Sequence, residues 1–322
     1  MSAGAPCGVA EAVAALRAGQ VIGLPTETVY GLAGDAANAQ AVARIFALKR
    51  RPPDHPLIVH LGDAAQLDDW ARVVPAAART LAARYWPGPL TLVLPRAARV
   101  PDAITGGQDT VALRMPAHPL ARAVLAAFGG ALAAPSANRF GRISPTRAEH
   151  VRAEFGDAVP CVLDGGPCAV GIESTIVDLS AGAPRILRPG AITRAMLERT
   201  LGGPLAAGVA DDAPRVSGSL PAHYAPRTPL ALLDAPALRR RHGEDGALLL
   251  THSLAVDAAR GLRLPGDAAG YARALYAALR ELDARGARAI LAERVPDTPA
   301  WAGVRDRLTR AAAGAGRSSD AD

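Results

Sequence analysis

The chain keeps one lysine, Lys49, among its 36 lysine and arginine residues. Lys49 lies in ALKRRPPDHPLIVH, residues 47–60, followed by Arg50 and Arg51 and by two histidines, His55 and His60. A lysine ammonium is a compact point charge, whereas a guanidinium is a planar fork of donors, so the two are not interchangeable where phosphate oxygens are held. The stretch is typical of an anion site; a solvated helix end, where the helix dipole favours cations, is the alternative.

A second polar cluster lies in AAPSANRFGRISPT, residues 133–146. Asn138 is one of only two asparagines in the chain, and Ser136, Ser144 and Thr146 surround it. Hydroxyls and backbone N–H groups that lead into a helix suit an anion or a nucleotide. An ordinary helix N-cap by Ser144 or Thr146 is the alternative.

A third cluster lies in LPTETVYGLAGDA, where Thr26, Glu27, Thr28 and Tyr30 follow a short apolar run. Polar groups at the carboxyl end of a strand are where open α/β sheets usually bind ligands. A turn that is satisfied by its own threonines would have the same sequence. Both interpretations remain open at this level.

Further polar residues lie within or beside apolar strands. Arg114 stands inside VALRMP, where a charge is costly unless it is paired, either internally or with the carboxylate of a ligand. GIESTIVDL adds Ser174 and Thr175, and RILRPGAIT adds Arg185 and Arg188. These side chains are mostly hydrogen-bond donors, and no arrangement of them names a nucleophile or a general acid.

The chemistry that such donors support is the positioning and neutralising of anionic oxygens, as in phosphoryl and nucleotidyl transfer. The sequence has no GxxxxGK[ST], no GxGxxG after a strand, no HExxH and no GxSxG. Nucleotide binding must therefore use another architecture. From the residues alone, we expect a site for an anionic, nucleotide-like ligand.

The elements that must hold these residues alternate between strands and helices. The runs VIGLPT, PLIVHL, LTLVLP, VALRM, ALAAP, CVLD, STIVDL and RILRP predict strands. EAVAALRAG, AQAVARIFALKR, PAAARTLAARYW, PLARAVLAAFG and PTRAEHVRAEFG predict helices. Alternation of this kind favours an α/β domain.

A second, smaller domain follows a linker. After TRAMLERTL, residues 201–230 are rich in Gly, Pro, Ala and Ser with little periodicity. LALLD, ALLLT and ARAILAE then alternate with helical patterns around residues 235–242, 268–285 and 299–312. This pattern again predicts an α/β sheet.

Composition narrows the class of protein. With 50% hydrophobic and 20% charged residues over 322 positions, we expect a soluble globular chain of about two domains. The net charge of +6 permits contact with polyanions, but the densest basic run, residues 239–241, is typical of a solvated helix end. Cys7, Cys161 and Cys168 lack metal-site spacing, and we expect small buried thiols in a reducing compartment without a disulfide. Without a signal peptide or a long apolar run, we expect a cytoplasmic protein with no membrane partner.

Eight motifs together resemble one family. LPTETVYGLAGDA, LKRRPPDHPLIVH, WPGPLTLVL, TVALRMPAHPLA, APSANRFGRISPT, DGG, GIESTIVDL and ILRPGAIT follow the order found in YrdC-type L-threonylcarbamoyladenylate synthases, over about residues 10–200. HYAP, residues 223–226, is similar to the linker of the longer two-domain members. Their linker more usually begins SPG and continues through a basic segment, whereas this chain has VSGSLPAHYAP.

The resemblance implies a twisted, mixed-sheet YrdC-like α/β domain with a concave basic cavity, and a smaller Rossmann-like α/β C-terminal domain. The implied division is a catalytic domain over 1–203, a linker and lid over 204–228, the C-terminal domain over 229–313 and a disordered tail over 314–322. We expect residues 214–227 to fold across the cavity, exclude water and retain a labile product.

The implied enzyme is a nucleotidyltransferase that uses ATP, L-threonine and bicarbonate. The threonine amine is carboxylated to a carbamate, whose oxygen attacks the α-phosphate, and the products are threonylcarbamoyl-AMP and pyrophosphate. A downstream tRNA threonylcarbamoyl transferase complex then moves the group to an adenosine of tRNA. Mg²⁺ is expected with the triphosphate, with unknown protein ligands and no organic cofactor.

The resemblance also implies residue roles. The catalytic signature falls on Lys49, Arg51, Ser136 and Asn138. ATP is expected at Arg51, His55, Thr110, Ser136, Ser144, Arg188 and Tyr224. L-Threonine is expected at Thr28, His60, Arg114 and Ser174, with a main-chain contact at Ala134, and its carboxylate would pair with Arg114.

Two alternatives stay open. A module of the same fold could bind structured RNA, including a weak contact with tRNA, without making an adenylate; such binding would fall steeply with salt. A carbamoyl-adenylate-forming domain of a larger maturation enzyme would use carbamoyl phosphate. The second alternative lacks accessory zinc-finger and acylphosphatase-like segments, and the HYAP linker disfavours it.

Overall fold

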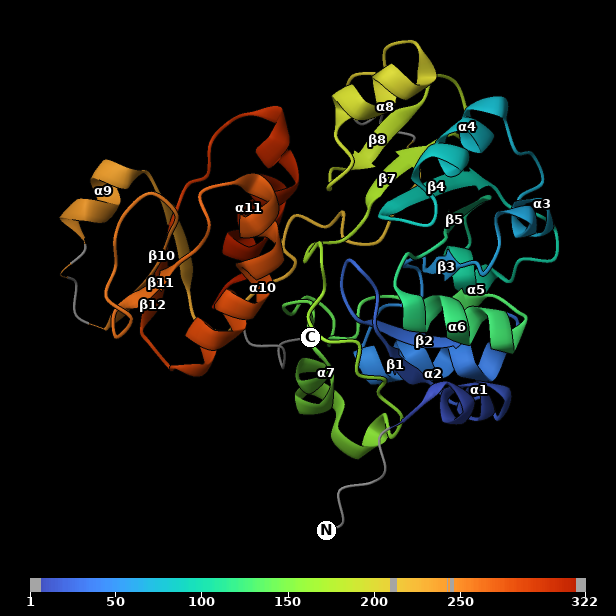
Figure 1. Cartoon of the computed structure of the whole chain (residues 1–322), viewed down its shortest axis with the longest axis horizontal. Helices are drawn as coiled ribbons and strands as arrows, with labels where there is room; N and C mark the ends of the chain where they lie inside the picture. Colours follow the sequence, from blue (N-terminus) through green and yellow to red (C-terminus); the bar gives the residue numbers. More distant parts are fainter. Residues whose placement is uncertain (1–6, 209–212, 242, 244–245, 317–322) are drawn as a thin grey trace.

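The computed structural model describes residues 7–208, 213–241, 243 and 246–316. Figure 1 shows two α/β bodies joined by one crossing segment. The predicted α/β class, with a mixed sheet followed by a second small sheet, is confirmed. Within these residues, no helix combines the length and the apolar character needed to cross a membrane.

The first body is built on an eight-stranded mixed sheet. Its strands are β1 Ile22–Leu24, β2 Gly31–Asp35, β3 Ile58–His60, β4 Leu90–Pro95, β5 Thr110–Arg114, β6 Leu132–Ala133, β7 Thr175–Asp178 and β8 Arg185–Arg188. Their order is β1-β2-β6-β3-β5-β4-β7-β8, with β3 parallel to β5 and β4 parallel to β7. In β4, LTLVLP, the first five residues are all buried, as expected of a strand covered on both faces.

Helices and short 3-10 turns connect these strands. They are α1 Val9–Arg17, α2 Ala39–Lys49, η1 Ala64–Gln66, α3 Leu67–Trp70, α4 Ala76–Tyr85, α5 Asp102–Thr105, α6 Pro119–Phe128, α7 Ala148–Phe155, η2 Gly156–Ala158 and α8 Arg194–Leu201. The Asn38 side chain caps the start of α2, and Arg50 ends it in the left-handed conformation, with φ of 50°. Ala41, Ile45 and Lys49 are buried at four-residue spacing, so Lys49 lies on the core face of α2.

Two segments of the first body differ from the prediction. CVLD, residues 161–164, is not a full strand: it forms an isolated bridge between Val162 and Gly23, with one backbone hydrogen bond on each side. Conversely, GLAGD forms β2, although glycine and aspartate have low strand propensity. β2 exists because it pairs with β1 on one side and β6 on the other.

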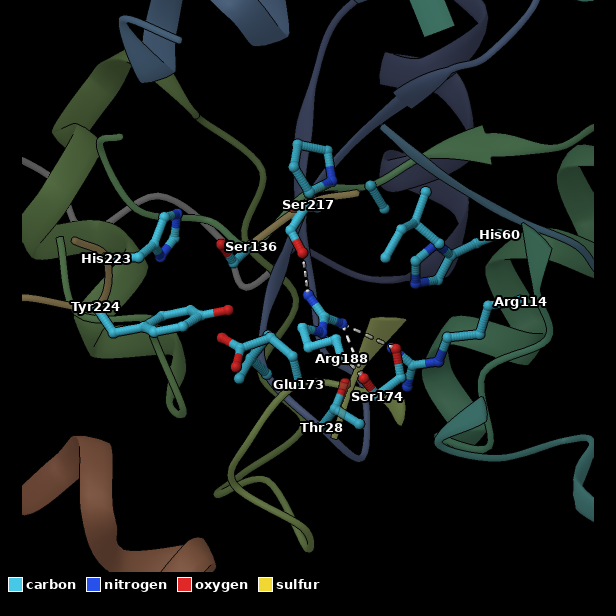
Figure 2. A pocket seen from close by; sticks show the side chains of 14 residues that line it. Thr28, His60, Arg114, Ser136, Glu173, Ser174, Arg188, Ser217, His223 and Tyr224 are labelled. Atoms are coloured by element: carbon cyan, nitrogen blue, oxygen red, sulfur yellow. Dashed lines mark hydrogen bonds between the residues drawn. The ribbon is translucent and has the colours of Figure 1, made fainter. Parts of the chain in front are cut away.

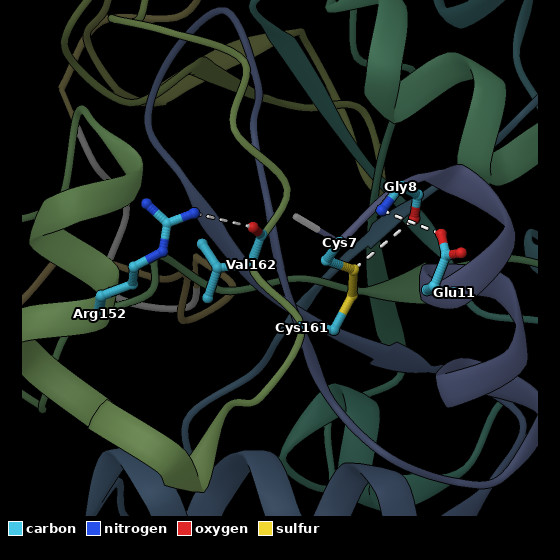
Figure 3. Close-up of a disulfide and its surroundings, with 6 residues drawn as sticks. All are labelled: Cys7, Gly8, Glu11, Arg152, Cys161 and Val162. Carbon is cyan, nitrogen blue, oxygen red and sulfur yellow. Dashed lines mark hydrogen bonds between the residues drawn. A yellow bond between two sulfur atoms is a disulfide. The ribbon is translucent and has the colours of Figure 1, made fainter. Parts of the chain in front are cut away.

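The expected absence of a disulfide is wrong for two of the three cysteines. Cys7 and Cys161 are bonded to each other, with their Cα atoms 5.3 Å apart (Figure 3). Cys7 precedes α1, and Cys161 belongs to the apolar cluster against which α1 packs, so the fold brings the two thiols together. Cys168 is a free, buried thiol, as predicted.

The second body is a four-stranded, all-parallel sheet. Its elements are β9 Leu230–Leu233, α9 Ala235–Arg240, β10 Ala247–Thr251, β11 Gly261–Arg263, α10 Ala268–Ala284, β12 Ala289–Glu293, η3 Pro299–Trp301 and α11 Ala302–Gly314. The strand order is β11-β10-β12-β9. β11 was not predicted, because a three-residue strand carries almost no periodic signal.

The linker joins the two bodies across one face of the first. Between α8 and β9 the described residues form no helix or strand, apart from an isolated bridge between Ala225 and Arg142. Gly314 is the last residue of α11 rather than the first residue of a tail. Residues 317–322, the rest of the predicted tail, lie outside the described residues, and the predicted domain boundaries remain a prediction.

Candidate active site

One pocket gathers polar residues from segments far apart in the chain (Figure 2). It is formed by the loop between β1 and β2, the ends of β3 and β5, the segment after β6, the segments around β7 and β8, and the linker. Its lining residues are Thr28, Val29, Ile58, His60, Arg114, Ala134, Pro135, Ser136, Glu173, Ser174, Arg188, Ser217, His223 and Tyr224. The lining therefore combines two guanidinium groups with several hydroxyls and one carboxylate.

All five positions predicted to contact L-threonine line this pocket: Thr28, His60, Arg114, Ala134 and Ser174. The sheet explains the central pair. β3 and β5 are parallel, and His60 is the register partner of Arg114 at their carboxyl ends. His60 and Arg114 thus lie at the carboxyl ends of adjacent parallel strands, where α/β proteins usually bind a ligand.

Arg114 has an internal partner. Its Nη2 donates to Glu27 Oε1 at 2.6 Å, and the backbone N–H of Ala117 donates to Glu27 Oε2 at 3.0 Å. Burial alone would raise the pKa of Glu27, but the charge and hydrogen bond of Arg114 lower it. Internal pairing therefore explains a cation inside this strand, and pairing with a ligand carboxylate would be an additional interaction.

The loop between β1 and β2 is held by its own threonines. Thr26 Oγ1 donates to the carbonyl of Val29 at 2.6 Å and accepts the backbone N–H groups of Thr28 and Val29. The turn interpretation of this motif is therefore confirmed. It also brings Thr28 into the pocket wall, so the turn and a ligand contact are compatible.

His60 is a neutral imidazole. Burial, followed by the charge of Arg114, lowers its pKa to about 3. Its Nδ1 is buried and has no hydrogen-bond partner among the described residues. Such an atom is costly to leave unpaired, which favours a ligand group as its partner.

Three of the predicted ATP contacts line the pocket: Ser136, Arg188 and Tyr224. The Arg188 guanidinium is fixed by three hydrogen bonds. Its Nε and Nη2 donate to the carbonyl of Ser174 at 3.1 and 3.0 Å, and its Nη1 donates to the carbonyl of Ser217 at 2.8 Å. The guanidinium thus ties the segment before β7 to the linker.

Four predicted ATP contacts, Arg51, His55, Thr110 and Ser144, lie outside the described lining of this pocket. Arg51 donates to the carbonyl of Pro56 at 2.9 Å, and burial lowers its pKa to about 10. His55 packs edge-on against Phe140, and Thr110 begins β5.

Ser144 and Thr146 do not cap the following helix, which is a correction to the N-cap alternative. Ser144 donates its hydroxyl to Glu173 Oε1 at 2.6 Å. Arg147 occupies the N-cap position of α7 and makes no side-chain cap. Because α7 begins at Ala148, the N-cap position falls on Arg147 and not on Ser144 or Thr146.

Lys49 and Asn138 support the loop that carries Ser136. Lys49 Nζ donates to the carbonyls of Ser136 and Asn138, both at 2.6 Å. The amide of Asn138 donates to the carbonyls of Arg139 and Arg142. Burial, followed by the charge of Arg51, lowers the pKa of Lys49 well below its usual value. A compact ammonium suits two converging carbonyls better than a planar guanidinium, which gives the single lysine a structural reason.

The linker closes one side of the pocket. Tyr224 is only 1% exposed, and its hydroxyl has no hydrogen-bond partner among the described residues. Its φ of 61° is rare for a residue with a side chain and is stored strain. His223 is also buried, and burial lowers its pKa to about 3. The linker therefore lies against the pocket as a packed segment.

Glu173 is a pocket residue that the sequence reasoning did not single out, although it lies in the motif GIESTIVDL. It is buried, and burial would raise its pKa, but the charges of Arg307 and Arg188 and the Ser144 hydroxyl lower the pKa to about 2. Arg307 belongs to α11 of the second body. The second body thus reaches the wall of the pocket.

The donor set does not form a magnesium site of its own. Within the described residues, no group of three or more His, Cys, Asp or Glu side chains could hold a metal ion. Glu173 is the one carboxylate among the described lining residues, and Ser144, Tyr276 and Arg307 already donate to it. Mg²⁺ prefers several oxygen ligands in octahedral geometry, which these residues do not offer.

Comparison with known proteins agrees with this geometry. The family model Sua5_yciO_yrdC, described as "Telomere recombination", matches residues 14–190, and Sua5_C, described as "Threonylcarbamoyl-AMP synthase, C-terminal domain", matches residues 192–313. A threonylcarbamoyl-AMP synthase of Bacillus subtilis is 40% identical over 95% of this chain and 93% of that protein. The synthase of Pyrococcus abyssi is 40% identical over 92% of this chain and 91% of that protein.

A solved structure of similar extent exists. The crystal structure of P. abyssi Sua5 complexed with L-threonine superposes with a TM-score of 0.87 at 38% identity, covering 95% of this chain and 94% of that one. Both bodies and the linker are therefore included in the likeness. The chain belongs to the Sua5/YciO/YrdC family, in the two-domain form that carries the Sua5 C-terminal domain.

Proposed function

We propose that the protein is a threonylcarbamoyl-AMP synthase, which joins L-threonine, bicarbonate and ATP into threonylcarbamoyl-AMP, with release of pyrophosphate and of the water lost when the amine and bicarbonate form the carbamate. The observation that carries the proposal is the single pocket that gathers Thr28, His60, Arg114, Ala134 and Ser174 with Ser136, Arg188 and Tyr224. The resemblance to the synthase family implies these residues as contacts of the two substrates. Relatives named as this synthase at 40% identity support the same activity.

The pocket suits a reaction between two anions. The carbamate oxygen bonds to the α-phosphorus while the bond between that phosphorus and the bridging oxygen to the β-phosphate breaks, and pyrophosphate leaves with the electron pair. Arg114 and Arg188, which both line the pocket, offset the negative charge of the substrates. Neutral His60 adds no charge and can accept or donate one hydrogen bond through its free Nδ1.

The role of Mg²⁺, the downstream partner, the location in the cell and the roles of residues outside the pocket lining are also proposals. Mg²⁺ enters with ATP, held by phosphate oxygens and water, since the pocket lacks the oxygens to bind it alone. The product passes to a tRNA threonylcarbamoyl transferase complex, and the protein works in the cytoplasm. Lys49, Arg51 and Asn138 keep their proposed catalytic roles beside Ser136. Arg51, His55, Thr110 and Ser144 keep their proposed roles as ATP contacts.

The test is pyrophosphate release by the purified protein with each substrate omitted in turn, with mass spectrometry of the adenylate. Release should require all three substrates. Arg188→Gln should lower the rate at least 100-fold, whereas Arg185→Gln, on the same strand but outside the described pocket lining, should keep it within 3-fold. Salt-sensitive RNA binding without pyrophosphate release would instead support the RNA-binding alternative.

A further inference from the structure

Two side chains of the second body, Arg307 and Tyr276, reach the pocket residue Glu173. Arg307 of α11 is 0% exposed, although it belongs to the last helix of the chain. Its Nε donates to Glu173 Oε2 at 2.8 Å, and its Nη1 donates to the carbonyl of Pro189 at 2.9 Å. A buried guanidinium is costly unless its donors are used. Nη1 also pairs with Asp306 of the same helix at 2.7 Å, and the other donors contact the first body, including the carbonyl of Glu173.

Arg307 touches three segments of the pocket wall. Glu173 precedes Ser174, Pro189 follows Arg188, and the Arg307 guanidinium lies over the Tyr224 ring, 5.4 Å from its centroid. These segments are the start of GIESTIVDL, the residue after β8 and the linker. One side chain of the second body therefore fixes parts of the site that lie far apart in the sequence.

Glu173 is saturated by its partners. Ser144 donates to Oε1, and both Tyr276 of α10 and Arg307 donate to Oε2, at 2.9 and 2.8 Å. Among the described residues, Arg307 is the cation that forms an ion pair with this carboxylate. Two of the three donors thus come from the second body.

Arg188 stands in the same pocket wall as Glu173 (Figure 2) and is electrostatically coupled to it. It is held instead by the carbonyls of Ser174 and Ser217. If Glu173 lost its ion-pair partner, its charge would attract Arg188, the guanidinium that lines the same pocket and already lowers the pKa of Glu173. That new pair would withdraw the positive charge that Arg188 offers to ATP.

We propose that Arg307 is a positioning residue for ATP binding: with Tyr276, it holds the Glu173 carboxylate so that Arg188 stays available to the nucleotide. The second body then serves the reaction directly, as a charge clamp on the pocket wall. This inference rests on the proposed function, because it takes ATP as the ligand of Arg188.

The experiment compares ATP and threonine affinity by calorimetry, and both KM values by pyrophosphate release, in four full-length variants. Arg307→Gln should weaken ATP binding at least 10-fold and change threonine binding less than 3-fold. Adding Glu173→Gln to that variant should restore ATP affinity to within 3-fold of the wild type, because no buried charge then competes for Arg188. A purely structural role of Arg307 predicts no such rescue.

Two further variants keep the test decisive. Tyr276→Phe removes one hydrogen bond to Glu173 with little change of volume and should weaken ATP binding 2- to 5-fold. Arg305→Gln is the matched control: it lies on α11 as well, but it pairs with Asp297 within the second body, so ATP affinity should be unchanged. Circular dichroism and thermal unfolding report whether each variant is folded.

The outcomes separate this inference from the proposed function. ATP affinity unchanged in Arg307→Gln, equal losses for ATP and threonine, or no rescue by Glu173→Gln would overturn the clamp. If Arg307→Gln did not fold, unchanged ATP affinity in Tyr276→Phe would overturn it. ATP binding with the expected pattern but no pyrophosphate release would refute the synthase and leave the clamp standing.

Discussion

Replacing Lys49 by methionine tests whether this residue is a loop support or a phosphate ligand. The substitution keeps the apolar stem but removes the ammonium that donates to the carbonyls of Ser136 and Asn138. The carbonyl of Asn138 would be left without a donor, which costs about 1–3 kcal/mol. The carbonyl of Ser136 keeps the backbone N–H of Asn138 but loses a hydrogen bond from a charged group, worth about 1.5–3 kcal/mol. Relief from burying a charge offsets part of that cost, since burial already lowers the pKa of Lys49. We expect a net loss of about 2–4 kcal/mol in the free energy of unfolding.

The assay is urea unfolding followed by tryptophan fluorescence, with and without ATP. Arg44→Met, on the exposed face of the same helix, is the matched control and should change stability by less than ~0.5 kcal/mol. If Lys49→Met kept the stability of the control but lost ATP binding, the ammonium would bind phosphate directly. The loop-support interpretation would then be refuted.

Three further predictions follow from the same contacts. Gly218→Ala should lower ATP affinity, because the φ of Gly218 is 76° and an added Cβ would lie 2.0 Å from the Tyr224 hydroxyl. Gly203→Ala is the control: its Cβ meets nothing within 4 Å, so ATP affinity should not change. Equal ATP affinities in the two variants would contradict the linker's role. Acid should destabilise the fold between about pH 6.5 and 3, because the pKa of both His60 and His223 falls to about 3 on folding and the unfolded chain then binds more protons. In His60→Gln, the urea midpoint should fall less between pH 7 and pH 5 than in the wild type. An equal fall in the two proteins would contradict this role of His60. Reduction by dithiothreitol, or Cys7→Ser, should lower the free energy of unfolding by about 2–4 kcal/mol, because the bond to Cys161 closes a loop of 154 residues. Equal urea midpoints for oxidised and reduced protein would argue against a formed disulfide in solution.

Sequence patterns predicted most of the elements because each is locally periodic. The apolar run of β4 and the four-residue spacing of buried positions in α2 are visible without any tertiary information. β2 was missed because its residues, GLAGD, are made into a strand by two neighbours rather than by their own propensity.

The candidate site was also predictable from the sequence only in part. The threonine-binding residues lie in long motifs, and the parallel pairing of β3 with β5 brings His60 beside Arg114. The ion pair between Glu173 and Arg307 spans 134 residues and two bodies. Arg307 shares the helical spacing of the buried residues Val304, Leu308 and Ala311, so the pattern of α11 places it on the packed face, but the pattern does not show which carboxylate it meets. Such a contact depends on how the bodies dock, which local periodicity does not encode.

The late position of Arg307 has a consequence for the nascent chain. The first body, through α8, is synthesised roughly a hundred residues before α11, which is about 5–20 seconds at usual elongation rates. During that interval a folded first body would already expose its substrate-facing residues, but without the linker packed on them or the guanidinium that restrains Glu173. The contact of the linker and of Arg307 with the pocket wall can therefore form only after α11 has been synthesised.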